Sequence, residues 1–173
     1  MLKWITGCVV SLAERRIGVK LDYARKIAQT DIGLMMRYGK IFGFLDPNRN
    51  VPADAYHVAR LRGAVSADCG ACVAAEINLA KAAGVSTACV SAVLLGDYAD
   101  LSADLRAVAC LADAVTGPRA DDPVARDGVV QAYGEAGLIE LSFAMNGAAL
   151  LPGIKRAMGY ATTCDLNILR QLV

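Results

Sequence analysis

The spacing of apolar residues is the feature that most limits how this chain can fold. Between Leu21 and Phe42, apolar side chains recur at intervals of three and four residues, as on one face of an amphipathic helix. No alternating run of Val, Ile or Thr lasts more than a few residues. Aromatic residues, which strands favour, make up only 6% of the chain. The pattern therefore predicts an all-α protein.

Capping and breaking residues divide the chain into about eight helices. A cluster of Gly, Pro, Asn and Asp in residues 43–52 predicts a loop. This loop separates an N-terminal helical arm, residues 1–50, from a core, residues 51–173, and we expect both to belong to one single-domain helical bundle. The capping and breaking residues that set the other boundaries are Ser66, Asp68, Gly84, Ser86, Gly96, Ser102, Gly117, Pro118, Pro152 and Gly153.

The chain carries more apolar residues than a soluble monomer usually does, at 55% of its length and a mean hydropathy of +0.40. A membrane-spanning helix needs about 18 consecutive apolar residues. The two longest uncharged stretches, 82–96 and 141–154, are shorter and contain Gly and polar residues. Burial between subunits is the better use of the surplus, which predicts a homo-oligomer and no membrane partner.

Charge and the N-terminal segment indicate a cytoplasmic protein that does not bind nucleic acid. The net charge is +1, with 18 basic and 17 acidic residues and no basic block. Residues 5–8 look like a lipoprotein cleavage box, but only seven residues precede Cys8. A signal peptide needs a basic region and an apolar stretch of about 7–15 residues before its cleavage site. We therefore expect the segment to form the first helix.

Two of the six cysteines stand apart from the rest. Cys8, Cys89, Cys110 and Cys164 are scattered, mostly among apolar residues, where a free cysteine acts as a small buried hydrophobe. Cys69 and Cys72 lie close together beside polar residues. This spacing in an intracellular chain is typical of a redox pair.

The segment Asp68–Glu76, D-C-G-A-C-V-A-A-E, carries the chemistry. If a helix begins at Asp68, then Cys69, Cys72 and Glu76 lie on one face within two turns. A thiolate near a helix N-terminus has a lowered pKa. A sulfenic acid on one cysteine could condense with the other, the first step of a recyclable thiol peroxidase.

Two alternatives to a redox pair remain open on the residues alone. A zinc site could combine both cysteines with Glu76 and with His57, the only histidine of the chain. The two cysteines could also be purely structural, and His57 could be a core histidine bonded to a backbone carbonyl.

Residues Val51–Tyr160 resemble the alkylhydroperoxidase D-like branch of the carboxymuconolactone decarboxylase superfamily. The resemblance rests on Y-H-V-A-R-L-R-G-A-V-S-A-D-C-G-A-C, on A-K-A-A-G-V-S, and on the segment 140–159, E-L-S-F-A-M-N-G-A-A-L-L-P-G-I-K-R-A-M-G. The branch bears the pattern E-x11-C-x2-C-x3-H. Here the pattern is H-x11-C-x2-C-x3-E, with His57 and Glu76 exchanged in position.

The resemblance implies a thiol-dependent alkyl hydroperoxide reductase, an antioxidant enzyme. Cys72 would be the peroxidatic thiol and Cys69, nearer to solvent, the resolving thiol. Glu76 and His57 would form the proton relay in contact with Cys72. No metal, flavin or haem would be needed. Trimers or hexamers are expected, with a lipoyl-bearing or thioredoxin-like protein to reduce the disulfide.

Three other functions fit parts of the pattern: a non-redox enzyme of the same superfamily acting on a lactone or β-keto acid, a general disulfide reductase, and an assembly protein with a redox-sensitive staple. We expect Glu140 and Asn146 on a helix that lines the pocket and packs subunits. Arg60 and Arg62 are expected on a solvated face or at a subunit contact.

Overall fold

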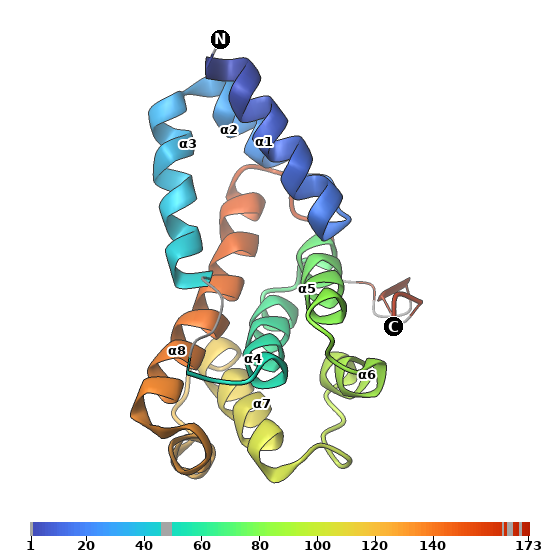
Figure 1. Ribbon diagram of the computed structural model, residues 1–173, viewed down its shortest axis with the longest axis vertical. Coiled ribbons are helices and arrows are strands. Elements are labelled where there is room, and N and C mark those ends of the chain that lie inside the picture. Colours follow the sequence, from blue (N-terminus) through green and yellow to red (C-terminus); the bar gives the residue numbers. More distant parts are fainter. Residues whose placement is uncertain (1, 46–49, 164, 166–167, 170) are drawn as a thin grey trace.

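The computed structural model describes residues 2–45, 50–163, 165, 168–169 and 171–173, and these contain helices and no strand (Figure 1). The prediction of an all-α bundle of about eight helices is confirmed. The elements are α1 (Leu2–Ile17), α2 (Asp22–Thr30), α3 (Ile32–Gly39), the 3₁₀ helix η1 (Lys40–Leu45), α4 (Ala53–Ser66), α5 (Gly70–Ala82), α6 (Thr87–Leu95), α7 (Ala103–Thr116) and α8 (Pro123–Ala157).

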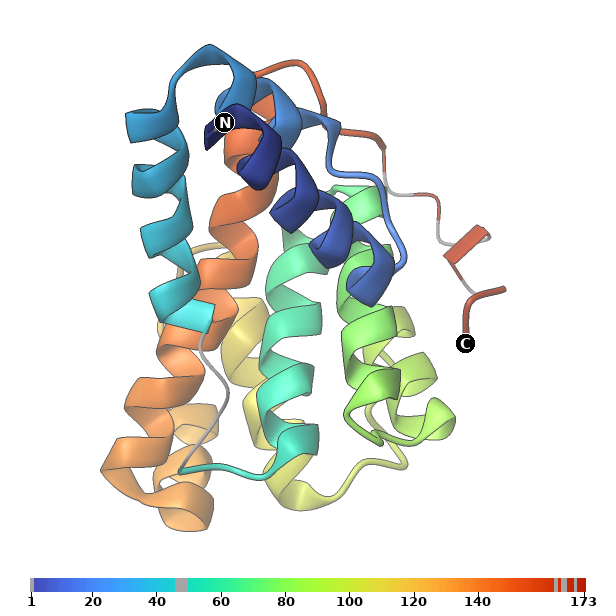
Figure 2. The ribbon, with the colours of Figure 1, turned by 45° about the horizontal axis from the view of Figure 1, so that its top comes forward.

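Helix α4 lies at the centre of the bundle and packs against α5, α7 and α8 (Figure 2). Small residues let its neighbours approach closely, since Ala55, Ala59 and Ala64 have no exposed surface. At Gly63 an added Cβ atom would lie 2.2 Å from the carbonyl oxygen of Met145 in α8. The closest helix contact of the core therefore depends on the absence of a side chain at Gly63.

The N-terminal arm, α1 to η1, covers the end of the bundle where α5 begins and α8 ends (Figures 1 and 2). It has a small apolar cluster of its own around Val10, Tyr23 and Tyr38. Leu151 of α8 and Met158, the C-cap of that helix, pack against this cluster. The arm therefore lies beside the cysteine motif, although it is far from the motif in sequence.

Two predicted N-caps are confirmed. The hydroxyl group of Ser86 accepts a hydrogen bond from the amide of Cys89, and that of Ser102 accepts one from Leu105. Each satisfies one of the free amides in the first turn of a helix. The left-handed residue Gly96 ends α6 as predicted.

The predicted break at Pro152 is wrong. Helix α8 continues through Pro152 to Ala157, because this proline is buried in the packed part of the helix and packing outweighs its missing amide. The sequence also predicts a division between a helix over 124–132 and one over 135–151, and this division is confirmed, because the helical geometry is interrupted at Gly134, with φ 70° and ψ 178°. The predicted loop 43–52 begins later than expected, since Gly43 to Leu45 belong to η1, and its residues 46–49 lie outside the described residues.

Among the described residues, α8 is the one helix long and apolar enough to cross a membrane by length and composition. Core helices of soluble proteins meet the same two conditions. Here α8 packs against α4 and α7 and buries Leu141, Ala144 and Met145. The bundle thus accounts for the buried apolar face of α8, while Ile139, Phe143 and Leu150 of the same helix remain about half exposed.

The scattered cysteines differ in part from the prediction. Cys8 is exposed on α1, which contradicts the expected burial, and Cys89 and Cys110 are half-buried. Cys164 lies outside the described residues. The helical periodicity of α1 explains the exposure of Cys8, since Cys8 lies on the same side of the helix as the exposed residues Val9 and Leu12.

Candidate functional site

The cysteine motif lies at the N-terminus of α5. Helix α5 begins at Gly70, and its N-cap is Cys69, one residue later than predicted. Asp68 has a left-handed backbone, φ 48°, because it closes the turn between α4 and α5 with its amide bonded to the carbonyl of Val65. The carbonyl of Cys69 then accepts hydrogen bonds from the amides of Cys72 and Val73, both at 2.9 Å.

The sulfur atoms of Cys69 and Cys72 lie 3.0 Å apart, and both cysteines are free. A disulfide bond is about 2.05 Å long, so a small movement would join them. Cys69 has no exposed surface, whereas Cys72 is partly exposed. The expectation that Cys69 lies nearer to solvent is therefore wrong, because the turn before α5 and the segment after α8 cover it.

The two thiols ionise as a pair. A hydrogen bond from Cys72 lowers the pKa of Cys69 to about 5; burial opposes this, and the amides of Cys72 and Thr162 and the charge of Lys155 assist it. The same hydrogen bond, together with burial, raises the pKa of Cys72. Near neutral pH the pair thus holds one proton and one negative charge between two adjacent sulfur atoms.

The segment that follows α8 fixes the turn that carries the cysteines. The amide of Gly70 donates to the carbonyl of Thr162 at 3.1 Å, and that of Ala71 donates to the Thr162 hydroxyl at 3.2 Å. Arg156 donates to the carbonyls of Ala67 and Asp68, at 3.0 and 2.6 Å. These bonds satisfy first-turn amides of α5 and hold Cys69 in place.

Lys155 is the cation beside the cysteine pair. Its side chain is only 5% exposed, and its charge and hydrogen bonding counter the larger effects of Cys69 and burial, which raise the pKa of Cys72. Its Nζ atom lies 5.3 Å from the centre of the Tyr23 ring. The hydroxyl groups of Tyr23 and Tyr38 are 2.5 Å apart, so both helices α2 and α3 of the arm reach this site.

Glu76 lies one turn after Cys72 and is held by Arg60. The guanidinium group of Arg60 donates from Nε to Oε2 at 2.7 Å and from Nη2 to Oε1 at 2.8 Å, and both side chains are buried. A bidentate pair of this kind occupies both carboxylate oxygens. The prediction that Arg60 lies on a solvated face or at a subunit contact is therefore wrong.

His57 lies at the other end of the α4–α5 pair. It lines a small apolar cavity with Ala80, Cys89 and Val93, and its Nδ1 atom is buried without a hydrogen-bond partner among the described residues. Burial, and after it the charge of Arg60, lowers the pKa of His57 to about 4. The imidazole is therefore neutral at physiological pH.

The structure places Cys69, Cys72 and Glu76 between the N-cap and the middle of α5 but does not bring His57 to them. Helices α4 and α5 run antiparallel, so Arg60 faces Glu76 and His57 faces Ala80. Ala80 is about 12 Å along the helix axis from Cys72. The expected contact of imidazole, carboxylate and thiol is not formed in the described part of the chain, and the zinc alternative lacks one of its four ligands.

Arg62, Glu140 and Asn146 also have definite partners. Arg62 binds Asp113 at 2.5 Å and the carbonyl of Val93 at 2.8 Å, so its expected place on a solvated face or at a subunit contact is wrong. Glu140 accepts hydrogen bonds from the amide and side chain of Asn50. Asn146 donates to the carbonyl of Ser142.

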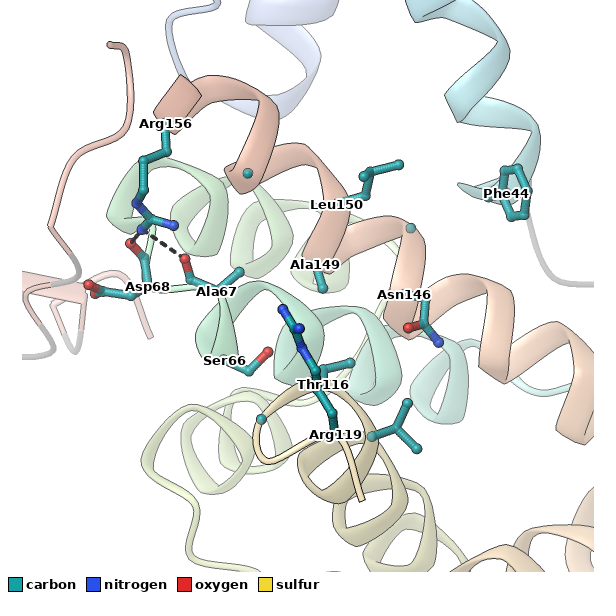
Figure 3. A pocket seen from close by; sticks show the side chains of 14 residues that line it. Phe44, Ser66, Ala67, Asp68, Thr116, Arg119, Asn146, Ala149, Leu150 and Arg156 are labelled. Atoms are coloured by element: carbon teal, nitrogen blue, oxygen red, sulfur yellow. Dashed lines mark hydrogen bonds between the residues drawn. The ribbon is translucent and has the colours of Figure 1, made fainter. Parts of the chain in front are cut away.

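A cleft of about 900 Å³ lies beside the turn that carries the cysteines. Its lining includes Asn146, as expected of a pocket-lining helix, and the two arginines Arg119 and Arg156 (Figure 3). Phe44 and Leu150 form an apolar side of the cleft. Neither Cys69 nor Cys72 lines it, so the cleft neighbours the thiol site without exposing the sulfur atoms.

Lys155, Tyr23 and Tyr38 are site residues that the sequence did not single out. A signal for Lys155 was present, since Leu151 and Met158 flank it at helical spacing on a face that packs against the arm. A basic residue in the middle of an apolar face requires a partner. No local pattern joins the two tyrosines to the cysteines, because the arm meets the motif only through tertiary packing.

Comparisons of this chain with protein-family models, with curated proteins and with solved structures found no match.

Proposed function

We propose that this protein is a thiol-dependent oxidoreductase that reduces hydroperoxides with Cys69 and Cys72, as an antioxidant enzyme. The observation that carries the proposal is the 3.0 Å contact between two free cysteines at the N-terminus of α5. The lowered pKa of Cys69, about 5, supports it, because a thiol pair that is already ionised at neutral pH is ready to attack an electrophile.

Cys72 is the proposed attacking thiol, because it is the member of the pair with exposed surface. Transfer of the shared proton to Cys69 across the 3.0 Å contact leaves the thiolate on Cys72. This thiolate attacks the terminal oxygen of a hydroperoxide; an S–O bond forms, the O–O bond breaks, and the alkoxide leaves as an alcohol after protonation. Cys72 is then a sulfenic acid.

Cys69 completes the cycle. Its sulfur attacks the sulfenic sulfur of Cys72, an S–S bond forms, and the oxygen leaves as water. The hydroperoxide has then gained two electrons and two protons. An external dithiol, proposed to be on a lipoyl-bearing or thioredoxin-like protein, reduces the disulfide. No proton in this cycle passes through His57, which lies two helical turns away beside Ala80.

A homo-oligomeric state, trimeric or hexameric, is proposed with this function, in the cytoplasm. Large apolar side chains are exposed on one region of α8 and η1, including Phe44 and Phe143, whose rings meet edge to face and are 54% and 48% exposed. Ile139 and Leu150 of α8 are also half exposed. Burial of such residues between subunits would remove them from water.

The test exposes reduced protein to one equivalent of an alkyl hydroperoxide and follows peroxide and free thiols together. The proposal expects one peroxide lost for two thiols, no reaction in Cys72→Ser, and a trapped sulfenic acid in Cys69→Ser. Cys89→Ser, which removes a half-buried cysteine outside the motif, is the control and should react fully.

Two outcomes would overturn the proposal. Unchanged peroxide with intact thiols would do so. Oxidation of the pair by a small disulfide but not by any hydroperoxide would also do so, and would favour a general disulfide reductase.

A further inference from the structure

We infer that Lys155 is a catalytic residue of the cysteine pair: its buried ammonium group is the counter-ion of the thiolate and the proton donor to the leaving group, and Tyr23 and Tyr38 of the N-terminal arm hold it in position. The inference deepens the proposed function and rests on it for the peroxide step. The role as counter-ion does not depend on the peroxide step, because it rests on the burial of Lys155 and on its position between Tyr23 and the two thiols.

Burial without a carboxylate is the first observation. The Lys155 side chain is 5% exposed, yet in the described ranges of the chain its Nζ atom forms no salt bridge with an Asp or Glu. A buried ammonium group is costly unless an anion or several hydrogen bonds compensate it. The contact with Cys72 supplies an anion once the cysteine pair has lost one proton.

The tyrosines of the arm are the second observation. The face of the Tyr23 ring lies 5.3 Å from Nζ, a cation–π distance that holds the ammonium group without neutralising it. Tyr23 is fixed in turn by Tyr38, through the 2.5 Å hydroxyl contact and an edge-to-face ring contact of 5.7 Å. The ammonium group is thus held between an aromatic ring and a thiol.

The groups that face Lys155 come from three elements. Tyr23 and Tyr38 lie on α2 and α3, and burial raises the pKa of each, so both remain neutral phenols at physiological pH. Cys69 and Cys72 lie at the start of α5. On α8 the adjacent Arg156 turns to the carbonyls of Ala67 and Asp68. Among the residues that the structure describes, the cysteine pair is therefore the source of negative charge for Lys155.

The proton of Lys155 completes the peroxide step. When the Cys72 thiolate breaks the O–O bond, the departing alkoxide takes a proton from Nζ; an O–H bond forms and an N–H bond breaks. The second proton, on the oxygen released as water, comes from the Cys69 thiol. Lys155 ends the cycle as a neutral amine and regains its proton from solvent, so atoms and charge balance.

The test measures thiol ionisation directly, without peroxide. The rate of alkylation by iodoacetamide and the ultraviolet absorbance of the thiolate are followed against pH for wild type, Lys155→Met and Lys155→Arg. Lys155→Met should raise the lowest thiol pKa by about one unit or more, since a cation in contact has been removed. Lys155→Arg, which keeps the charge, should restore most of the profile.

Lys26→Met is the matched control, because it removes an exposed lysine of α2 without touching the cysteine pair, and it should leave the profile unchanged. Lys155→Gln is measured as a second neutral variant, so that the test stands even if Lys155→Met does not fold; circular dichroism checks each fold. A folded neutral variant with an unchanged thiol profile would overturn the inference.

The two proposals fail in different ways. If the pH profile shifts in Lys155→Met but the wild type consumes no peroxide, the peroxidase proposal fails while Lys155 remains the counter-ion. If the wild type consumes peroxide and the profile of Lys155→Met matches that of the wild type, the role of Lys155 is refuted and the peroxidase stands. If Lys155→Met loses the peroxide reaction but its thiol ionisation follows the same pH profile as that of the wild type, the counter-ion role is likewise refuted.

Discussion

Arg60 of α4 binds both carboxylate oxygens of Glu76 of α5 inside the bundle, at 2.7 and 2.8 Å. This ion pair joins the two helices one turn below the cysteine motif. It also shows how a carboxylate can lie close to a thiolate, since the charge of Arg60 balances that of Glu76.

Removal of one partner of the Arg60–Glu76 pair should lower the stability of the protein more than the removal of both partners would suggest. Glu76→Leu or Arg60→Met alone leaves a buried unpaired charge and should lower the free energy of unfolding by about 3–5 kcal/mol. The double variant should lose clearly less than the sum. Denaturant unfolding of the four proteins measures this, and strictly additive losses would show that the two side chains do not depend on each other.

Acid should destabilise the protein through His57. The pKa of this residue is lowered by burial and by Arg60 to about 4, below its usual value near 6.5, so the unfolded chain binds the proton first as pH falls. Stability is then lost between about pH 6.5 and pH 4, by up to about 1.4 kcal/mol per pH unit.

The measurement for His57 is the free energy of unfolding against pH for the wild type and for His57→Leu. The leucine variant should lack this part of the pH dependence. The substitution should also cost little stability at pH 7, because the Nδ1 atom that it removes has no hydrogen-bond partner among the described groups. Loss of peroxide activity in a folded His57→Leu protein would contradict the structural role and return His57 to the relay that the family resemblance implies.

The thiol pair should remain reactive in mild acid. The pKa of Cys69 is about 5, well below that of an ordinary thiol, so the fraction of ionised pairs should stay near its maximum above pH 6 and fall to half near pH 5. The rate of alkylation should follow this curve in the native protein. In denaturant the midpoint should move up to about 8.5, the value of a free cysteine; a native midpoint at that value would refute the prediction.

Gly63 should tolerate no side chain. A Cβ atom there would lie 2.2 Å from the backbone carbonyl oxygen of Met145, and neither helix can yield without disturbing the contact of α4 with α8. We expect Gly63→Ala to lower stability by about 1–3 kcal/mol or more, the usual effect of overpacking.

Gly7→Ala is the control for Gly63, since nothing lies within 4 Å of the added atom and the site is inside α1. It should be neutral or stabilise the protein by up to about 1 kcal/mol. Thermal unfolding of both variants checks the pair. Equal effects of the two substitutions would mean that α4 and α8 are not in close contact at Gly63.

Local patterns were sufficient for most of the helices. Ser86 and Ser102 begin helices where predicted, because an N-cap requires only a side chain and an amide three residues apart. The error at Pro152 has the opposite cause. The break that a proline favours locally was overridden by packing of α8, whereas the predicted division between a helix over 124–132 and one over 135–151 is found at Gly134.

The sequence alone determined the all-α fold, the helix at the cysteine motif and the short spacing of Cys69 and Cys72, because these depend on residues within one or two helical turns of each other. The tertiary structure decided the surroundings of the two thiols. The antiparallel pairing of α4 and α5 places Arg60 at Glu76 and moves His57 away, while folding of the arm onto α8 brings Tyr23 to Lys155. Contacts between segments so far apart depend on how helices pack, which no local pattern encodes.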